Sequence, residues 1–500
     1  MTRLFGRGRI CAVVAEPTAA TMLRGLRHAL RESSTVELRL DWLKSKAGLR
    51  RLLSHLRVNR KKFTVIATLR RKGSGGRYTG DLNDQLAELK NAVSAGCRWC
   101  DLEVESAERA DPAALNLLRK AGARVMVSFH DFRRTRGDLG RLVKRLDRCG
   151  GDAIKIAAES NTLRDSVRLL KAAKHRRHIV AVPMGETGLP GRVLALKEGS
   201  ALAYAATGEA TAPGQLDLAA MRGIYRADRL DRHTRVYGVI GNPIAHSLSP
   251  LIHNAAFAAR KVNAILVPFL VRDLRDFLAS RAAFGVAGFA VTLPHKQGII
   301  RHLKDCDPLA ERIGAVNTVV VRGDSRLYGY NTDYVGVLRA LERHVQLAGS
   351  RVLILGAGGA ARAAVFALAE AGAVVSITAR REARASSLAL VAGGEAIARR
   401  RLKKEFFDAI INATPVGMQS GDDAPLRADE LNCRVVMDMI YRPIDTPLLK
   451  LARRRGIETV SGLEMFLAQG IAQWEIWMGE RAPAEIMRRV VLAALRREHN

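Results

Sequence analysis

Hydrophobic residues in the first part of the chain gather in eight short runs, and a longer stretch of helical pattern follows most of them. Such helical stretches cover, for example, residues 18–30 and 81–95. Short apolar runs that alternate with helices predict parallel strands, and eight such repeats predict a (β/α)8 barrel. The runs cover residues 10–15, 36–40, 63–68, 98–104, 124–128, 152–157, 178–183 and 201–206.

Polar residues interrupt or directly follow several of these runs, where a buried strand would normally carry apolar side chains only. They are Glu37, Arg39, Arg70, Asp101, Glu103, His130, Lys155 and Gln215. Most lie towards the C-terminal ends of the predicted strands, which is where barrels of this kind carry out chemistry. A lone lysine in such a strand suggests a Schiff base, because a desolvated position favours the free amine that attacks a carbonyl.

The pattern changes from about Arg235, and an apolar strand over residues 351–355 then leads into a glycine turn and the start of a helix. The turn consists of Gly356, Ala357, Gly358, Gly359 and Ala360. This order fits the dinucleotide-binding fingerprint in the variant that ends in alanine. Glycines let the backbone approach a pyrophosphate, which the helix N-terminus stabilises. A glycine turn alone is weak evidence, and the flanking strand and helix strengthen it.

The end of the next strand bears on the choice of cofactor. NAD-binding proteins place an acidic residue there, whereas this chain has Arg380, Arg381 and Arg384. Arginines can bind the 2′-phosphate of NADP in a bidentate manner. The alternative is a solvated basic helix start, in a chain rich in arginine. We predict NADP(H) rather than NAD.

Length and composition set outer bounds on the protein. A chain of 500 residues predicts two or three domains, and no apolar run reaches the roughly 18–20 residues that a membrane span needs. The N-terminal residues lead straight into the first strand, so we expect no targeting segment. Six sparse cysteines favour a reducing cytoplasm. Cys97 and Cys100 form a C-x-x-C pair without a second pair, so we predict structural cysteines and no metal.

The formal net charge of +32 raises the hypothesis of nucleic-acid binding. The basic residues are spread over both halves, however, and aromatic residues that could stack on bases are few. Neither half shows a nucleic-acid-binding motif. We therefore predict small-molecule substrates, with no nucleic-acid or membrane partner.

Motifs of the first half occur in the order typical of one enzyme family. They are Glu37-Leu38-Arg39, Thr68-Leu69-Arg70 with Gly75-Gly76, Asp101-Leu102-Glu103, Ser128-Phe129-His130-Asp131-Phe132, Lys155-Ile156-Ala157, Glu186-Thr187-Gly188 with Arg192, and Ala212-Pro213-Gly214-Gln215. With these motifs, residues 1–225 resemble type I 3-dehydroquinate dehydratase.

Motifs of the second half belong to another family. They are Gly238-Val239-Ile240-Gly241-Asn242-Pro243 with Ser247 and Ser249, Val291-Thr292-Leu293-Pro294-His295-Lys296, Gly314-Ala315-Val316-Asn317-Thr318, Asn331-Thr332-Asp333, the glycine turn, Asn412-Ala413-Thr414-Pro415, and Gly462-Leu463-Glu464-Met465 with Gln469. With these motifs, residues 235–500 resemble shikimate dehydrogenase. The two resemblances imply an α/β architecture with a dehydratase barrel over residues 1–228. They further imply a substrate-binding lobe over 235–338, completed by 463–500, and a Rossmann NADP-binding domain over 339–462.

The first resemblance implies how a dehydratase site would work on 3-dehydroquinate, which has a ring ketone and a carboxylate. Lys155 would form an iminium with the ketone, and His130 would be the general base. The substrate would be held by Glu37, Arg39, Arg70, Arg192, Thr211 and Gln215. The family usually has an acidic residue where this chain has Ser74, and that residue helps to orient the histidine. We expect Asp101 or Glu103 to take over this role, or the dehydration to be slow.

The second resemblance implies a site that reduces 3-dehydroshikimate to shikimate. Lys296 and Asp333 would form a catalytic pair that handles a proton and binds substrate. Further substrate contacts would come from Ser247, Ser249, Thr292, Asn317, Tyr441 and Gln469. Cofactor contacts would come from the glycine turn, Arg380, Arg381, Arg384, Thr414, Met439 and Gly462.

Two other readings stay open at this point. The first is a basic scaffold or nucleic-acid-binding protein that keeps both folds without activity. The second is a related enzyme that acts on quinate with NAD, against which the three arginines argue.

Overall fold

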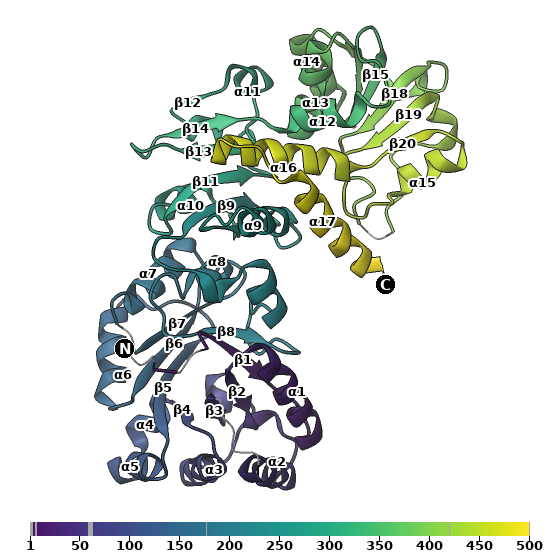
Figure 1. Ribbon diagram of the computed structural model, residues 1–500. Helices are drawn as coiled ribbons and strands as arrows, with labels where there is room; N and C mark the ends of the chain where they lie inside the picture. Colours follow the sequence, from purple (N-terminus) through teal and green to yellow (C-terminus); the bar gives the residue numbers. More distant parts are fainter. Residues whose placement is uncertain (1–3, 6–7, 59–63, 177, 420, 500) are drawn as a thin grey trace. The chain divides into compact units, whose positions relative to one another are not determined.

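The computed structural model describes residues 4–5, 8–58, 64–176, 178–419 and 421–499 (Figure 1). The chain divides into two units, residues 1–235 with 267–285 and residues 236–266 with 286–500. Strand β10 (Ala264–Leu270) crosses this division, and we describe it with the second unit because it is hydrogen-bonded in a sheet there.

The first unit is built around an eight-stranded parallel sheet in the order β7-β6-β5-β4-β3-β2-β1-β8. A hydrogen bond from Ala201 N to Ile179 O, at 2.9 Å, links the strands at the two ends of this order and closes the ring further. The predicted (β/α)8 barrel is therefore confirmed, although residue 63 of the predicted run 63–68 lies outside the described residues. The strands are β1 (Ile10–Val14), β2 (Thr35–Arg39), β3 (Thr64–Thr68), β4 (Trp99–Glu103), β5 (Arg124–Asp131), β6 (Ala153–Glu159), β7 (Ile179–Met184) and β8 (Ala203–Ala206).

Helices connect successive barrel strands, and polar caps fix where several of them begin. Thr18 and Thr162 each accept a hydrogen bond from the third residue of the following helix, whose side chain bonds back to the cap. This reciprocal capping satisfies backbone donors that the helix itself leaves unpaired. The helices are α1 (Ala19–Glu32), α2 (Lys46–Val58), α3 (Leu82–Ser94), α4 (Val104–Arg109), α5 (Pro112–Lys120), α6 (Leu139–Arg148), α7 (Leu163–Ala173) and α8 (Leu189–Leu194).

Side chains of alternate strand residues fill the inside of the barrel. Phe5 stacks on Trp99 with ring centroids 4.3 Å apart, and Val13, Ile66 and Met126 are buried in the same cluster. Because side chains alternate along a strand, residues two positions further along each strand point to the same inner face. The polar residues of the site therefore follow this apolar layer towards the C-terminal ends of the strands.

The second unit contains a mixed six-stranded sheet in the order β10-β9-β11-β13-β14-β12, in which β13 runs antiparallel to both of its neighbours. Two long C-terminal helices belong to this part of the unit: α16 (Gly462–Met478) donates a hydrogen bond from Trp477 to Val319 O, and α17 (Ala484–His499) packs against α9. The other elements are β9 (Arg235–Gly241), β11 (Val286–Val291), β12 (Asp305–Cys306), β13 (Thr318–Val321), β14 (Leu327–Tyr330), α9 (Ser249–Ala259) and α11 (Pro308–Ile313). Helix α10 (Leu274–Ser280) lies in the segment 267–285, which belongs to the first unit, and packs against α7.

A second six-stranded sheet in this unit is parallel throughout, in the order β17-β16-β15-β18-β19-β20. The chain leaves β15 in one direction and resumes with β18 on its other side, which is the switch point where such sheets bind dinucleotides. Its elements are β15 (Arg351–Leu355), β16 (Val374–Thr378), β17 (Glu395–Ala396), β18 (Phe407–Asn412), β19 (Cys433–Asp438), β20 (Glu458–Val460), α12 (Asp333–Leu341), α13 (Gly359–Glu370), α14 (Glu382–Ala392) and α15 (Pro447–Arg454).

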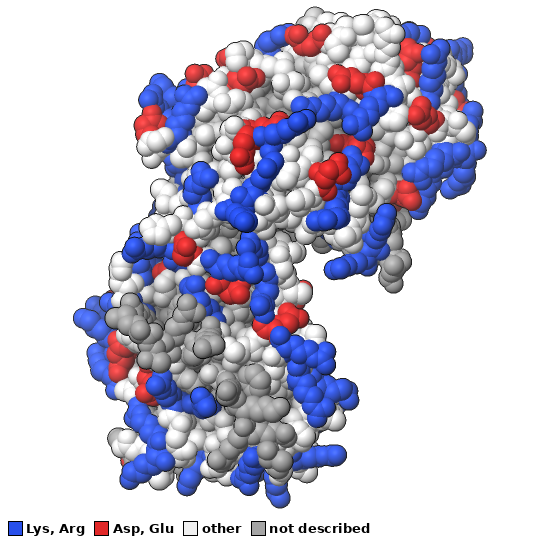
Figure 2. Space-filling model, in the orientation of Figure 1, with Lys and Arg blue, Asp and Glu red and all other residues white. Residues whose placement is uncertain are grey.

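The structure also bears on the predicted partners of the chain, through its helices, its surface charge and its cysteines. No helix in the described part of the chain is long and apolar enough to cross a membrane. On the face drawn in Figure 2, Lys and Arg side chains are scattered and do not gather in one continuous patch. Within the described ranges no group of His, Cys, Asp and Glu side chains could hold a metal ion. Cys97 and Cys100 are buried free thiols whose pKa burial raises, as expected of structural cysteines.

Candidate functional site

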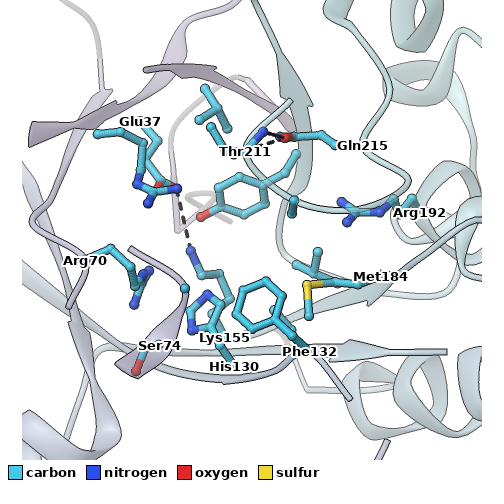
Figure 3. Close-up of a pocket in the computed structure, with 17 residues that line it drawn as sticks. Glu37, Arg70, Ser74, His130, Phe132, Lys155, Met184, Arg192, Thr211 and Gln215 are labelled. Atoms are coloured by element: carbon cyan, nitrogen blue, oxygen red, sulfur yellow. Dashed lines mark hydrogen bonds and ion pairs between the residues drawn. The ribbon is translucent and has the colours of Figure 1, made fainter. Parts of the chain in front are cut away.

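A cavity lies among the C-terminal ends of the barrel strands (Figure 3). All the catalytic and substrate-binding residues predicted for the first half of the chain line it, together with Ser74. The lining residues are Val13, Glu37, Arg39, Arg70, Ser74, Gly75, His130, Phe132, Lys155, Ala157, Val182, Met184, Arg192, Tyr204, Thr211, Ala212 and Gln215.

Lys155 projects from β6 and is only 4% exposed. Its Nζ lies 3.6 Å from Oε2 of Glu37 (Figure 3). It also lies 2.5 Å from Oδ2 of Asp101 and faces the ring of Tyr204 at 4.6 Å. Nζ of Lys155 thus lies beside two carboxylates and an aromatic face, which are groups that accompany a buried cation.

Asp101 links Lys155 to a second buried cation. Its Oδ1 lies 2.8 Å from a guanidinium nitrogen of Arg70 and accepts a hydrogen bond from Ser128 at 2.6 Å. Burial opposes ionisation of Asp101, but Arg70 and Lys155 outweigh it and hold the pKa of this carboxyl well below its ordinary value. Asp101 is therefore a permanent anion and a poor proton acceptor at neutral pH.

His130 has its ring at the cavity wall, parallel to the ring of Phe132 at 6.3 Å. Burial lowers its pKa well below the ordinary value, and the neighbouring cations Arg70 and Lys155 lower it further. The imidazole is therefore neutral at neutral pH, which is the form that accepts a proton.

The expected orienting partner of His130 is not where we predicted it. Nδ1 of His130 is buried and has no hydrogen-bond partner among the described residues. Asp101 is occupied by Lys155, Arg70 and Ser128, and Glu103 accepts instead from Arg71 N and Gln85. Neither Asp101 nor Glu103 hydrogen-bonds His130, because other donors nearby occupy both carboxylates. The other expected alternative, slow dehydration, stays a prediction.

Arg192 supplies positive charge on the side of the cavity opposite Arg70 (Figure 3). It is buried and donates to Pro213 O at 2.8 Å, while its Nε has no partner within the described ranges. Burial lowers the pKa of Arg192 to about 10, and Glu159 only partly offsets this effect. A buried guanidinium with unused donors favours binding of an anion such as a carboxylate.

Thr211 and Gln215 are tied together at the rim of the cavity. Oε1 of Gln215 accepts from the backbone N of Thr211 at 2.8 Å and from its hydroxyl at 3.0 Å. These bonds leave the amide group of Gln215 as a donor. Arg39, by contrast, is engaged in a bidentate ion pair with Asp41 at 2.8 to 2.9 Å, so it contributes shape and charge more than free donors.

A second cluster of charged residues lies in the second unit. Nζ of Lys296 lies 2.5 Å from Oδ2 of Asp333, the first residue of α12. The other oxygen of Asp333 accepts a hydrogen bond from Nδ2 of Asn317 at 2.8 Å. Both carboxylate oxygens are thus satisfied, and the lysine is fixed on one side of the carboxylate.

Other predicted substrate contacts come from loops near this pair. Ser247 accepts from Ser249 N at 3.3 Å after β9, and Thr292 follows the neighbouring parallel strand β11. Since these strands are parallel neighbours, both loops lie at the same edge of the sheet. Gln469 in α16 turns its amide to Phe466 O at 2.8 Å, so in this conformation one of its donors is occupied.

The glycine turn has the shape that a dinucleotide requires. Gly356 has a φ of +111°, and a Cβ there would lie 3.1 Å from Thr414. Gly358 precedes α13, which no side chain caps, and a Cβ on Gly358 would meet nothing within 4 Å. Open space in front of uncapped helix N–H groups fits a pyrophosphate. The residues present therefore fit the predicted nucleotide.

The remaining predicted cofactor contacts gather near this edge of the sheet or stand exposed. Gly462 lies so close to residues 439–440 that a Cβ would be 2.5 Å from Ile440 O, and Tyr441 stacks on Phe466 at 4.5 Å. Arg380, Arg381 and Arg384 follow β16, are exposed, and form no ion pair with any described residue. Their guanidinium groups are therefore available for a phosphate.

Comparison with known proteins agrees with this geometry. A family model described as type I 3-dehydroquinase matches residues 10–232. Two others, the shikimate dehydrogenase substrate binding domain and the shikimate 5′-dehydrogenase C-terminal domain, match residues 239–319 and 462–492. A bifunctional 3-dehydroquinate dehydratase/shikimate dehydrogenase of Arabidopsis thaliana, described as chloroplastic, is 35% identical over 476 residues, which cover 90% of this chain and 78% of the relative. The chain belongs to the bifunctional 3-dehydroquinate dehydratase/shikimate dehydrogenase family.

Relatives of the second half alone point the same way. A shikimate dehydrogenase (NADP(+)) of Pyrococcus furiosus is 39% identical over 270 residues, 53% of this chain and 98% of the relative. The crystal structure of shikimate dehydrogenase from Aquifex aeolicus superposes with a TM-score of 0.50 and 36% identity, and it covers 52% of this chain and 99% of that chain.

Sequence reasoning does not single out two residues that complete the dehydratase-type cavity. Ser128 joins Arg70 to Asp101, with Arg70 donating to Ser128 at 2.7 Å, and Tyr204 covers Lys155. Strand parity is the signal that could have found Ser128, since it precedes His130 by two positions and shares its inward face. Tyr204 reads as an ordinary apolar strand residue, and only the closed barrel brings it to Lys155.

A buried carboxylate also lies behind the nucleotide-binding edge of the dehydrogenase part. Asp438, at the end of β19, accepts hydrogen bonds from Asn412 at 3.1 Å, Ile440 N at 3.0 Å and Thr446 at 2.7 Å. Burial raises its pKa to about 6, although the three donors work in the opposite direction. Asp438 thus ties together the two loops that carry Thr414 and Met439.

This pKa predicts a pH-dependent stability. Since the folded protein binds the Asp438 proton more tightly than the unfolded chain, the stabilisation is fully present below about pH 4 and is lost as pH rises through about 6. Asp438→Asn mimics the neutral acid, so its stability relative to wild type should rise by on the order of 2–3 kcal/mol between pH 4 and 7. Thermal unfolding of both proteins over this pH range measures the effect. The relevant unfolding transition is the one whose midpoint NADPH raises. A constant difference at every pH would contradict the assignment.

Proposed function

We propose that this chain catalyses two consecutive reactions of the shikimate pathway. The barrel dehydrates 3-dehydroquinate to 3-dehydroshikimate, and the second unit reduces that product to shikimate with NADPH. The observation that carries the proposal is the buried Lys155 beside a neutral His130 in a cavity that also holds Arg192. Belonging to the bifunctional family supports the pairing of both reactions in one chain.

The dehydration begins with the side chain of Lys155. Once its ammonium has lost a proton, the amine attacks the ring ketone, and loss of water gives an iminium. The iminium withdraws electrons from the adjacent carbon and makes its hydrogen acidic. Asp101, a permanent anion 2.5 Å from Nζ, stabilises the positive charge that the nitrogen carries in the iminium. Asp101 thus faces a positive nitrogen both in the lysine ammonium and in the iminium intermediate.

His130 moves the proton in the second half of the reaction. The neutral imidazole accepts the proton from the carbon next to the iminium, and the hydroxyl on the following carbon leaves as the double bond forms. The imidazolium returns its proton to that hydroxyl, which departs as water. Hydrolysis of the iminium then releases 3-dehydroshikimate and regenerates Lys155.

The other cavity residues hold the substrate in our proposal. Arg192 offers unused donors to the substrate carboxylate, and Gln215 offers its amide to ring hydroxyls. Glu37, Arg39, Arg70 and Thr211 define the remaining walls.

The reduction uses the pair Lys296 and Asp333. NADPH, when bound, supplies the hydride to the substrate carbonyl carbon. Lys296 donates a hydrogen bond and then a proton to the carbonyl oxygen, and Asp333 keeps the lysine charged and accepts from a ring hydroxyl. Ser247, Ser249, Thr292, Asn317, Tyr441 and Gln469 are proposed as further substrate contacts.

The nucleotide is proposed to rest against the glycine turn. Gly356, Ala357, Gly358, Gly359 and Ala360 would contact the pyrophosphate, Arg380, Arg381 and Arg384 the 2′-phosphate, and Thr414, Met439 and Gly462 the nicotinamide half. In domain terms we propose a dehydratase barrel over residues 1–228, a substrate-binding lobe over 235–338 with 463–500, and an NADP-binding domain over 339–462. We also propose a cytoplasmic location, which rests on the six free thiols.

The two lysines give a matched pair of tests. Lys155→Ala should abolish dehydration and leave NADP-linked shikimate oxidation intact, and Lys296→Ala should do the reverse. Mass spectrometry after borohydride treatment with 3-dehydroquinate should show a covalent adduct in wild type and in Lys296→Ala, but none in Lys155→Ala. Loss of both activities in either folded variant would overturn the two-site proposal.

Cofactor choice is tested at the arginines after β16. Arg380→Ala with Arg381→Ala should weaken NADPH binding by roughly 10- to 100-fold or more, because each charge-assisted bond to phosphate contributes about 1.5–3 kcal/mol. NADH binding should change little. Arg454→Ala with Arg455→Ala is the control, since it removes the same charge at the end of α15, beside the N-terminal edge of the parallel sheet. Fluorescence titration measures all four affinities, and equal losses for NADPH and NADH would contradict contact with the 2′-phosphate.

Ser74 offers a test of the histidine's orientation. Ser74→Glu should place a carboxylate on the same cavity wall as His130, whose Nδ1 lacks a partner, and should raise the dehydration rate. Borohydride trapping at Lys155 should stay unchanged, because iminium formation does not need this partner. Ser74→Ala is the control and should leave the rate near wild type. Slower dehydration by a folded Ser74→Glu variant would mean that the site works through the serine itself.

A further inference from the structure

A buried polar network connects α16 to the catalytic pair of the dehydrogenase part. Its first member is Gln473, which lies one helical turn beyond Gln469 and is only 2% exposed. Nε2 of Gln473 donates to the backbone O of Asn317 at 3.3 Å and to the hydroxyl of Thr318 at 3.2 Å. Gln473 therefore binds the start of β13 and the residue before it, Asn317, whose side chain contacts Asp333.

A backbone group fixes the direction of the hydrogen bonds that the Asn317 amide makes. Oδ1 of Asn317 accepts from the backbone N of Thr332 at 2.7 Å, and a backbone N–H can only donate. The amide of Asn317 cannot flip without losing this bond, so its Nδ2 must face Oδ1 of Asp333, at 2.8 Å. Lys296 then occupies the other oxygen of Asp333, at 2.5 Å.

Thr318 transmits the constraint from Gln473 to Asn317. Its hydroxyl has a single proton, which it donates to Oδ1 of Asn317 at 2.8 Å, while its oxygen accepts from Gln473. Because Oδ1 of Asn317 is an acceptor, it takes the hydroxyl proton of Thr318, and a lone pair of the same hydroxyl accepts from Gln473. Gln473 thus holds the Thr318 hydroxyl in place beside the Asn317 amide.

The far side of Gln473 faces a neutral histidine. Burial lowers the pKa of His253 to about 4, against a smaller opposing effect of the Gln473 side chain. Neither ring nitrogen of His253 forms a hydrogen bond with any residue that the structure describes, and the same holds for Oε1 of Gln473. The orientation of the Gln473 amide is fixed on its other side, because the backbone O of Asn317 can only accept and therefore faces Nε2.

We propose that Gln473 is a positioning residue of the reductase reaction: acting through Thr318 and Asn317, it holds the Asp333 carboxylate in the orientation that keeps Lys296 aimed at the substrate carbonyl. This inference rests on the proposed function of the second unit.

The same helix supplies a control residue. Trp477 lies one turn further along α16 and also donates to β13, from Nε1 to Val319 O at 3.2 Å. Its acceptor is a backbone carbonyl with no link to the side chain of Asn317. Loss of this bond removes a buried contact between α16 and β13 without changing the network around Asp333.

Three single variants separate positioning from packing. Gln473→Met keeps the volume and removes the donor, and Gln473→Glu keeps the shape but turns an obligatory donor into an acceptor. Both should lower kcat for shikimate oxidation by about 10-fold or more, since small misplacement of a catalytic group can cost up to about 100-fold. KM for shikimate should change less than about 3-fold, because other residues supply most ring contacts, and NADPH affinity should stay at the wild-type value. Trp477→Phe should keep kcat within about 2-fold of wild type even where it lowers the melting temperature.

A double-mutant cycle tests the route through Thr318. Thr318→Val removes the relay, so combining it with Gln473→Met should cost little more than either change alone, whereas Trp477→Phe should combine additively with Thr318→Val. Thr318→Val alone carries the same test if Gln473→Met does not fold. Equal kcat losses for Gln473→Met and Trp477→Phe, or an additive cycle with Thr318→Val, would overturn the inference. A wild-type protein that does not oxidise shikimate with NADP would instead refute the proposed function, so the two failures are distinguishable.

Discussion

The ion pair between Lys155 and Asp101 is the interaction on which the barrel site depends. A buried ammonium is costly unless a carboxylate accompanies it, and a buried carboxylate needs donors for its remaining lone pairs. Asp101 meets both needs, with Lys155 on one oxygen and Arg70 with Ser128 on the other. Removing Asp101 would take from two buried cations, Lys155 and Arg70, the carboxylate that they share. The same arrangement that makes the charges tolerable also fixes the amine beside the cavity, so stability and chemistry constrain the same residues.

The second unit solves a similar problem with neutral groups. Asp333 holds Lys296 on one oxygen, but its other oxygen is satisfied by the amide of Asn317 and not by a second cation. A neutral donor leaves the pair without net charge, which suits a site whose cofactor itself carries phosphates. The orientation of such an amide depends on its own partners, and Thr332, Thr318 and Gln473 provide them. The position of Lys296 beside Asp333 is thus linked by hydrogen bonds to residues in or next to β13, α12 and α16.

Prediction from the sequence succeeded where the chemistry repeats along the chain and failed where it depends on competition. The eight apolar runs form eight strands in the structure. The order of apolar and polar residues along a run decides both that it forms a strand and which side chains point into the barrel. The glycine turn was placed between β15 and α13 for a similar local reason. The hydrogen bond expected from His130 to Asp101 or Glu103 is not formed, since Lys155, Arg70, Arg71 and Gln85 lie closer to these carboxylates than sequence order reveals. His130 is left with a buried nitrogen that no described residue satisfies.

The sequence by itself determined the two fold types, the strands that carry the polar residues and the motifs that identify both families. These features are local, because strand parity, glycine conformations and helix caps act within a few residues. Only the tertiary structure decided which charges pair, that Tyr204 from the last barrel strand covers Lys155, and that Gln473 reaches Asn317 across more than 150 positions of the chain. The physical reason is that ion pairs and buried hydrogen bonds are selected by distance and desolvation, and both quantities arise only when separate segments close around a common interior.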